Sequence, residues 1–341
     1  MIEPWQHKFK HECLKRPGQH IMIVATTGFG KTNVLQFITE GLVETAKNET
    51  IVYFDSGKSS EFLVLGQFAP LNVIVPRTMD IDIDAPGMDI RVRHMDQATE
   101  VWDLLVKSRI NVVVIEPYAD DPGIFVPIII KMFRTLIKKA RAYELPVPLT
   151  VEYDEINNIA PGKNNAHGPD HNRLGAVVQY NVEKLRSLKV RIVGSSQGWT
   201  SVRKGLRGHF HWTFAKNGAQ FTEGRMARYN AIFESLKEDE GILVYPDQKY
   251  SDVIRFPYYG EGDDFGTVRY AGELKPRGDP ERDEDRISLD DFLGINDDET
   301  TATEPAGEGA PEISIPAVLE LLDDATRGEV LAYLKEGKTL L

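Results

Sequence analysis

The sequence has 341 residues, a formal net charge of −12 and 41% hydrophobic residues. This length suits one large α/β domain with an appendage, or two domains, and the hydrophobic fraction is typical of a folded globular protein. The single cysteine, Cys13, excludes an internal disulfide and favours a reducing compartment such as the cytoplasm. No apolar run approaches the length of a membrane span, and the first residues do not resemble a signal peptide.

The negative charge is concentrated toward the C-terminus. Residues 270–312 hold 14 acidic and 4 basic side chains, whereas residues 1–269 hold 33 of each sign. The composition of 270–312 predicts an acidic disordered linker. Helical periodicity returns in residues 313–341, which predicts a small helical element that either docks onto an unidentified protein partner or packs back on the core.

A basic segment interrupts the neutral part of the chain. Residues 173–222 hold 9 Lys/Arg side chains and a single acid, Glu183. Such a segment is a candidate binding surface for a polyanion, although a solvated basic face has the same composition.

The chain begins with a short helical pattern over residues 5–15, which ends at Pro17-Gly18. We therefore expect an N-terminal helix within residues 1–16 and a main domain over residues 17–269. An apolar strand then leads into Ala25-Thr26-Thr27-Gly28-Phe29-Gly30-Lys31-Thr32, and a helical pattern follows at once. Strand, glycine-containing loop and helix in this order predict a P-loop.

A P-loop binds nucleotide phosphates through successive backbone N–H groups and the N-terminus of its helix. The residues expected to contact ATP are Thr27, Gly28, Phe29, Gly30, Lys31 and Thr32. Lys31 would reach the β- and γ-phosphates, and the Thr32 hydroxyl would bind Mg²⁺. Ala25 occupies the position of the first glycine in G-x-x-x-x-G-K-[ST], so the turn must avoid a positive φ there. The alternative is a strand–turn–helix that only imitates the motif.

The elements that follow alternate between strands and helices. We expect strand 51–55, strand 71–75, an exposed strand within 79–88, helix 97–108, strand 111–115 and helix 122–143. Asp55 ends the first of these strands. It is expected to cap a following helix, or to lie near the nucleotide at the ligand edge of the sheet.

Two acids end the next strand, residues 148–155. In a P-loop enzyme, Asp154 would hold Mg²⁺ through water and Glu155 would orient and deprotonate the attacking water. Two surface acids at the end of a strand are the alternative. Glu152, two residues before Asp154, is assigned no role.

A polar loop over residues 157–171 precedes helix 173–188 and strand 190–195, after which Gln197 stands at the same predicted sheet edge. There Gln197 can contact the γ-phosphate. Strand 209–215, helix 223–236 and a hairpin of 241–245 with 253–256 complete the domain. A zinc site is disfavoured, because no cysteine is near the histidines and their spacing fits no standard finger. These histidines are His167, His171, His209 and His211.

Together these motifs resemble the FtsK/HerA superfamily of P-loop motors. The resemblance rests on Thr27 to Thr32, on the strand ending Asp154-Glu155 and on the strand Val190 to Gln197, which looks like the sensor strand of the family. It implies an α/β, RecA-like P-loop NTPase core with a mostly parallel sheet flanked by helices. It also implies ATP and Mg²⁺ as cofactors.

Members of the family are ring-forming ATPases, commonly hexamers, that pull double-stranded DNA through a central channel. An arginine of one subunit completes the ATP site of its neighbour. Arg186, eleven residues before Gln197, occupies the place of that arginine, and Arg203 and Arg207 are alternatives. The basic segment could then supply both this arginine and a DNA-facing surface.

Features that the sequence lacks narrow the choice among the branches of this family. The sequence has no room for the N-terminal β-barrel of the HerA branch, and it lacks the membrane spans of coupling proteins and cell-division translocases. A bare motor core is similar to the genome-packaging ATPases of membrane-containing viruses, which would place the protein in the cytoplasm or in association with a virion.

We therefore expect an ATP-driven double-stranded DNA translocase, serving viral genome packaging or plasmid DNA transfer. The alternative is a P-loop ATPase for virion, secretion or pilus assembly that does not move DNA. A non-catalytic binding module is disfavoured because Lys31, Thr32, Asp154 and Glu155 are all present. A GTPase is disfavoured because no Asn-Lys-x-Asp guanine signature occurs.

Overall fold

The computed structural model describes residues 4–55, 60–115, 118–119, 121–162, 165–166, 168–222 and 224–271. The predicted helical element at 313–341 and all of the predicted acidic linker except Tyr270 and Ala271 lie outside these residues. Those two residues belong to a strand, β12 (Thr267–Ala271), so the folded part extends past the predicted boundary.

A ten-stranded sheet forms the centre of the domain, with the order β11-β10-β9-β1-β8-β7-β2-β6-β3-β5. Its strands are β1 (Ile21–Val24), β2 (Thr50–Asp55), β3 (Leu71–Pro76), β5 (Ile90–Met95), β6 (Ile110–Val114), β7 (Leu149–Tyr153), β8 (Val190–Ser196), β9 (Trp212–Ala215), β10 (Glu240–Val244) and β11 (Ile254–Arg255). The strands from β5 to β9 in this order are parallel, and β10 and β11 are antiparallel additions at one edge. The predicted α/β class with a mostly parallel sheet is confirmed.

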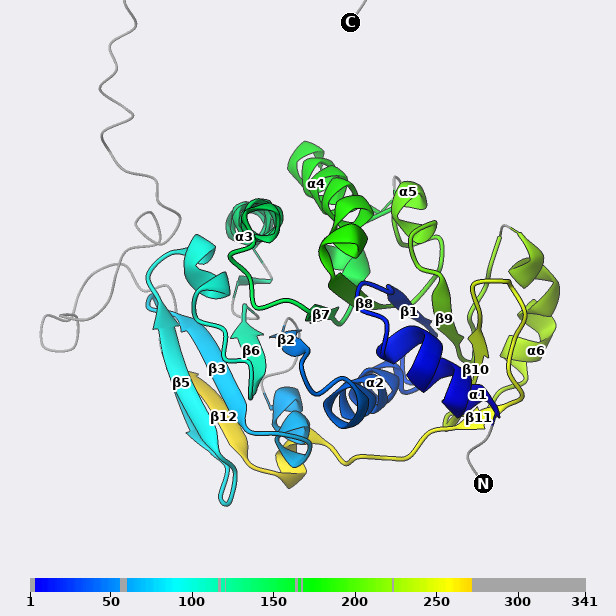
Figure 1. Cartoon of the computed structure of the whole chain (residues 1–341), viewed down its shortest axis with the longest axis horizontal. Coiled ribbons are helices and arrows are strands. Elements are labelled where there is room, and N and C mark those ends of the chain that lie inside the picture. Colours follow the sequence, from blue (N-terminus) through cyan, green and yellow to red (C-terminus); the bar gives the residue numbers. More distant parts are fainter. Residues whose placement is uncertain are drawn as a thin grey trace, which may run out of the picture. The chain divides into compact units, whose positions relative to one another are not determined.

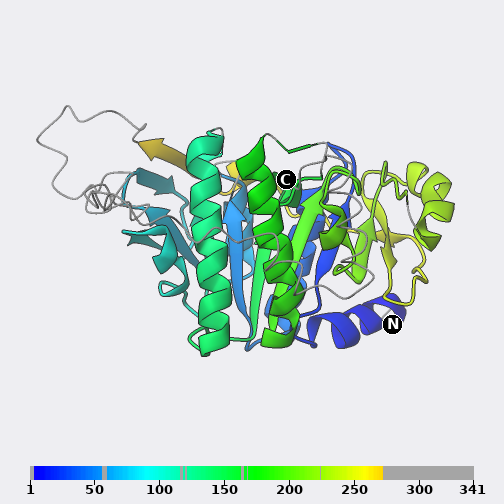
Figure 2. The same ribbon diagram turned by 90° about the horizontal axis from the view of Figure 1, so that it is seen from above.

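Helices cover both faces of this sheet. Figures 1 and 2 show α3 (Pro122–Ala142), α4 (Pro169–Leu185) and α5 (Lys204–Arg207) on one face, with α2 (Lys31–Thr45) and α1 (Pro4–Lys8) on the other. All residues of β1, β7 and β8 are buried, as expected for parallel strands covered on both sides. Parallel strands also bring their carboxyl ends to one edge, where loops can form a ligand site.

The bounds of three predicted helices can be compared with the structure. The Asp121 side chain caps α3 by accepting from Gly123 N at 2.8 Å, and Pro122 takes the first helical position. The N-terminal helix is split, since α1 continues into a π-helix over Phe9–Leu14. The predicted helix 173–188 starts earlier, at Pro169, and its last turn is the 3-10 helix Arg186–Leu188.

The predicted helix over residues 97–108 is wrong beyond its first turn. Only a 3-10 helix, Ala98–Trp102, forms there. Beyond Trp102, backbone groups form hydrogen bonds with asparagine side chains instead. Asn111 Oδ1 accepts from Val106 N at 2.7 Å, and Asn72 Nδ2 donates to Leu104 O at 3.0 Å. These asparagines come from neighbouring strands and replace the helical hydrogen bonds.

The predicted helix over residues 223–236 is also shorter. It consists of a 3-10 helix, Arg225–Tyr229, and α6 (Asn230–Glu234). The Asn230 side chain bonds the backbone N–H and carbonyl of Phe221, which fixes a turn before α6. The strand β5 and a 3-10 helix over Glu61–Gln67 are among the elements that were not predicted.

The exposed strand predicted within 79–88 is confirmed as β4 (Asp80–Asp84), in which exposed aspartates alternate with half-buried Ile81 and Ile83. It pairs antiparallel with β12 in a separate two-stranded sheet. The segment that leads from β11 to β12 passes α2 on its way (Figure 1), and it includes a 3-10 helix, Gly262–Asp264. Within the described ranges, no helix combines the length and the apolar character needed to cross a bilayer.

Candidate functional site

The glycine loop lies between β1 and α2, as predicted. Gly28 and Gly30 have φ values of +82° and +66°, a backbone region that glycine enters without a steric penalty. Gly30 is also the residue that precedes the first turn of α2. Ala25 is not among the four described non-glycine residues with positive φ, and its N–H donates to Ser196 O at 3.2 Å. The loop therefore turns after Ala25, at Gly28 and Gly30.

The second strand-end motif meets the loop across the sheet edge. The Thr32 hydroxyl donates to Asp154 Oδ2 at 3.1 Å. The other carboxylate oxygen of Asp154 accepts from the Ser195 hydroxyl and from Glu155 N. Hydroxyl and carboxylate oxygens are ligands that Mg²⁺ prefers, so the donor chemistry of Thr32 and Asp154 fits the predicted Mg²⁺ site.

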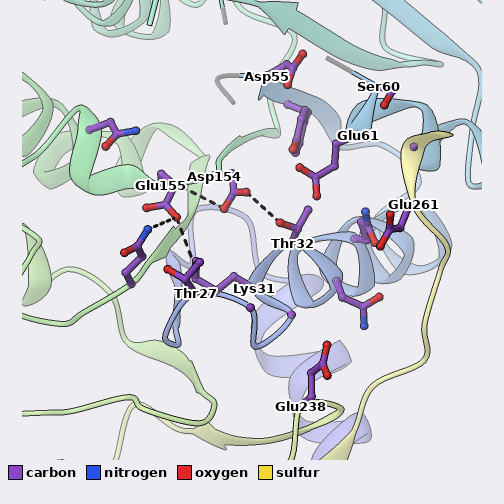
Figure 3. Close-up of a pocket in the computed structure, with 18 of the residues that line it drawn as sticks. Thr27, Lys31, Thr32, Asp55, Ser60, Glu61, Asp154, Glu155, Glu238 and Glu261 are labelled. Carbon is purple, nitrogen blue, oxygen red and sulfur yellow. Dashed lines mark hydrogen bonds and ion pairs between the residues drawn. The ribbon is translucent and has the colours of Figure 1, made fainter. Parts of the chain in front are cut away.

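Glu155 lies between the loop lysine and the predicted sensor. Its Oε1 is 3.5 Å from Lys31 Nζ and accepts from Gln197 Nε2 at 3.2 Å. Figure 3 shows Glu155, Asp154, Thr32, Lys31 and Thr27 gathered at this end of the site. The structure thus brings the predicted Lys31, Thr32, Asp154, Glu155 and Gln197 together, although they come from three separate strand ends.

Glu155 also has an unusual backbone. Its φ is +57° and its ψ is +54°, a left-handed conformation that costs free energy in a residue with a Cβ. Its N–H donates to Ser195 Oγ and Asp154 Oδ1, both at 3.1 Å. These bonds hold the turn that directs the Glu155 carboxylate to Lys31, and the sequence carried no signal of this geometry.

A cavity of about 830 Å³ extends from this constellation. On the far side from Glu155 it is lined by Asp55, Ser60, Glu61 and the segment from Tyr258 to Asp263. Asp55 lies at the cavity and accepts from the Tyr270 hydroxyl at 3.2 Å. The residue that directly precedes the next described helix, Glu61–Gln67, is Ser60. Asp55 therefore lies at the ligand edge of the sheet, where it lines the cavity.

Residues at the end of β9 support the P-loop from the side, and sequence reasoning missed them. Asn217 O accepts from Thr26 N at 3.1 Å. The Lys216 side chain is fully buried, and its Nζ donates to Glu238 O at 2.7 Å and lies 3.4 Å from where a Cβ on Gly30 would be. Burial lowers the pKa of Lys216 to about 8. An alternating strand sequence ending in Ala-Lys-Asn offered no signal that the lysine points beneath the loop.

Glu152, which had no predicted role, is buried between β7 and the P-loop helix. Its Oε2 lies 2.8 Å from Thr39 Oγ1, which also contacts Leu35 O at 2.9 Å. Burial raises the pKa of Glu152 to about 8. At neutral pH it is therefore a mostly protonated link between α2 and the strand that carries Asp154.

Arg186 lies away from this constellation in its own chain. It starts the 3-10 turn before β8, whereas Gln197 follows the other end of that strand. Its Nη1 is 3.0 Å from His211 Nε2. Arg203 and Arg207 come after β8, and their guanidinium groups donate to Gln179 Oε1 and to Val202 O.

The basic segment is divided between the core and the surface. Arg191 is fully buried against Glu49, at 3.2 Å, and Lys216 is buried under the P-loop. The other seven basic side chains of the segment are exposed or half-buried: Arg173, Lys184, Arg186, Lys189, Arg203, Lys204 and Arg207. The charge available to a polyanion is thus smaller than the sequence indicates.

Two of the histidines considered for zinc have other partners. His171 Nε2 is 2.6 Å from Asn158 O, and His211 contacts Arg186. His167 lies outside the described residues.

Comparison with known proteins gives distant structural matches. No family model matches this chain, and no curated protein sequence does. The genome packaging NTPase B204 of Sulfolobus turreted icosahedral virus 2, in complex with sulfate, matches with a TM-score of 0.44 and 12% identity, covering 71% of this chain and 98% of that one. The bacterial conjugative coupling protein TrwB matches with a TM-score of 0.45 and 8% identity, covering 71% of this chain and 86% of that one.

A third match is the EccC protein of Thermomonospora curvata (ATPases 2 and 3, with a signal sequence peptide). Its TM-score is 0.43 and its identity 10%, and the match covers 73% of this chain and 40% of that one. These matches do not carry the fold class, which rests on the topology of this chain's own sheet. Because the identities and TM-scores are low, the function below rests on the site itself.

Proposed function

We propose that this protein is a Mg²⁺-dependent ATPase. The observation that carries the proposal is the convergence of Lys31, Thr32, Asp154, Glu155 and Gln197 at one sheet edge beside the cavity. A lysine and free helix N–H groups suit phosphates, paired hydroxyl and carboxylate oxygens suit Mg²⁺, and a carboxylate beside them suits a general base.

Each of these side chains has a separate role in hydrolysis. Lys31 and the loop N–H groups bind and orient the β- and γ-phosphates, and Thr32 and Asp154 would hold the metal. Bound Mg²⁺ would neutralise charge on the phosphate oxygens. A γ-phosphate beside Lys31 gives its ammonium another partner, which leaves Glu155 free to accept a proton from the attacking water. Gln197, which already donates to Glu155, keeps that carboxylate oriented.

We further propose that hydrolysis drives movement of double-stranded DNA by a ring of identical subunits, hexameric as the family resemblance implies. Exposed basic side chains on α4, the turn after it and α5 support contact with phosphates. Arg186 supports a ring, because its position away from its own site suits a residue that completes the site of a neighbour. Genome packaging is the process we propose first, with plasmid transfer second.

The second candidate is an ATPase that assembles or exports protein without moving DNA. It is favoured by the burial of Arg191 and Lys216, which leaves a less concentrated positive surface. In that case the exposed basic side chains would contact a neighbouring subunit.

ATP hydrolysis by the purified chain, with and without long double-stranded DNA, tests these proposals. The control is Glu155→Gln, which removes the base and keeps the shape. Stimulation by DNA that falls with rising salt and disappears in the variant supports the translocase. Hydrolysis that ignores DNA even at low salt supports the assembly ATPase. A wild-type rate equal to that of Glu155→Gln under all conditions contradicts the ATPase itself.

A further inference from the structure

The segment after β11 forms the wall of the cavity opposite the catalytic residues. Tyr258, Gly260, Glu261, Gly262 and Asp263 all line it. We name residues 257–263 the strap. Figure 3 shows Asp154 and Glu155 on one side of Thr32 and Glu261 on the other, with Glu238 below.

The strap is fastened to the first turn of α2 by one side chain. Asn33, the residue after Thr32, donates through Nδ2 to Pro257 O and accepts through Oδ1 from Tyr259 N at 3.3 Å. The two bonds bracket Tyr258, the residue between them. A second fastening lies farther along, where Gln67 Nε2 donates to Tyr259 O at 2.9 Å and the Tyr259 hydroxyl donates to Glu40.

The far end of the strap is held by close backbone contact. A Cβ on Gly262 would lie 2.1 Å from Ser60 O, so only glycine allows this approach. The Ser60 hydroxyl also donates to Asp263. With both ends fixed, the strap is a preformed wall of the cavity.

Charge divides the cavity into two parts. Lys31 and the loop N–H groups make the P-loop side favourable for phosphates. The strap side carries the carboxylates of Glu61, Glu261 and Asp263. Carboxylates repel phosphates but accept hydrogen bonds from ribose hydroxyls and exocyclic amines. The strap side therefore suits the uncharged part of a nucleotide.

Tyr258 is an exposed aromatic side chain at that end. Its side chain is 73% exposed although it lines the cavity. The terminal phosphate belongs beside Lys31 and Glu155, so the opposite end of the nucleotide must leave past Asn33, toward Tyr258. We propose that the strap is the nucleoside subsite and that the nucleobase stacks on the Tyr258 ring. This inference rests on the proposed ATPase function.

The test compares binding of Mg²⁺–ATP with binding of Mg²⁺–tripolyphosphate, which has the phosphates without the nucleoside. Affinities are measured by calorimetry on the full chain for the wild type and for Tyr258→Ala, Tyr258→Phe and Tyr250→Ala. Tyr250 is a matched control, since it is exposed, at 43%, and does not line the cavity.

We expect Tyr258→Ala to weaken ATP binding by about 5- to 100-fold, the range for loss of one base–aromatic stack, and to leave tripolyphosphate binding unchanged. Tyr258→Phe keeps the ring, so both affinities should stay near those of the wild type, as should those of Tyr250→Ala.

Two results would overturn the subsite: ATP binding by Tyr258→Ala equal to that of the wild type, or an equal loss for ATP and tripolyphosphate. If the wild type binds tripolyphosphate as tightly as ATP, the nucleoside makes no contact and the subsite is again wrong. If the wild type binds neither ligand, the ATPase proposal fails first.

Discussion

The ammonium of Lys31 lies 3.5 Å from the carboxylate of Glu155, although Lys31 begins α2 and Glu155 follows β7. The pair joins the phosphate-binding lysine to the proposed base. Because a bound γ-phosphate would compete for Lys31, ATP binding and activation of Glu155 are coupled through this one contact.

Glu155→Gln is the first prediction. The amide cannot accept a proton from water, so kcat should fall by about 10²- to 10⁴-fold, the usual contribution of a general base. ATP binding should be retained, because the variant no longer competes for Lys31. Steady-state kinetics and calorimetry measure the two effects. A variant that keeps more than a tenth of the wild-type kcat would remove Glu155 from the chemistry.

Asp154→Asn and Thr32→Ala should each weaken Mg²⁺ binding. The two side chains contact each other at 3.1 Å. Thr32→Ala removes the hydroxyl assigned to the metal, and Asp154→Asn removes the negative charge of the carboxylate. The Mg²⁺ concentration for half-maximal ATPase activity should rise by roughly 10-fold or more. Ser195→Ala, which removes a hydroxyl bonded to Asp154 and to Glu155 N but no oxygen assigned to the metal, is the control and should have a smaller effect on the Mg²⁺ requirement. An unchanged Mg²⁺ requirement in both variants would contradict the assignment.

Glu152 should make stability depend on pH. Burial raises its pKa to about 8 in the folded protein, from an ordinary value of 4.5. The folded state thus keeps a proton that the unfolded state loses. This contribution to the free energy of unfolding is fully present below pH 4.5 and is lost as pH rises toward about 8, with a slope of at most about 1.4 kcal/mol per pH unit.

Glu152→Gln cannot titrate, so its urea midpoint should fall less than that of the wild type between pH 5 and 8. Some slope will remain, because burial also raises the pKa of Glu49. Arg191 contacts Glu49 and opposes both shifts. Parallel curves for the wild type and the variant would show that Glu152 is ionised in the folded protein.

Lys216→Met should weaken ATP binding. The buried ammonium lies under Gly30 and donates to Glu238 O, so it adds positive potential beneath the phosphates. Loss of about 1 kcal/mol corresponds to roughly fivefold in Kd. The loss should grow smaller above pH 8, where the wild-type lysine loses its own charge. A Kd for the variant that equals the wild-type value at pH 7 would rule out this electrostatic role.

Arg186→Ala should abolish hydrolysis only if the side chain acts in a neighbouring subunit. Mixed rings of Arg186→Ala and Glu155→Gln subunits then contain some sites with both intact residues, so the mixture should recover activity that neither variant has alone. Arg203→Ala and Arg207→Ala serve as comparisons. Full activity of Arg186→Ala by itself would exclude it and leave the other two.

The sequence by itself determined the parts that depend on local pattern. Buried apolar runs predicted the parallel strands, and the glycine loop with Lys31 and Thr32 predicted the phosphate site. Asp154, Glu155 and Gln197 could be placed because each follows a strand, and parallel strands end at one edge. The prediction of a helix over residues 97–108 is wrong because the side chains of Asn72 and Asn111, which lie on other strands, form hydrogen bonds with the backbone of this segment.

Only the tertiary structure decided the contacts between distant segments. Lys216 reaches the P-loop because β9 pairs with β1, and the pKa of Glu152 is raised because its side chain is buried against α2. Tyr258 lines the cavity because Asn33 fastens a segment more than 200 positions away. Such contacts depend on which strands and helices pack together, and no local spacing in the sequence encodes them.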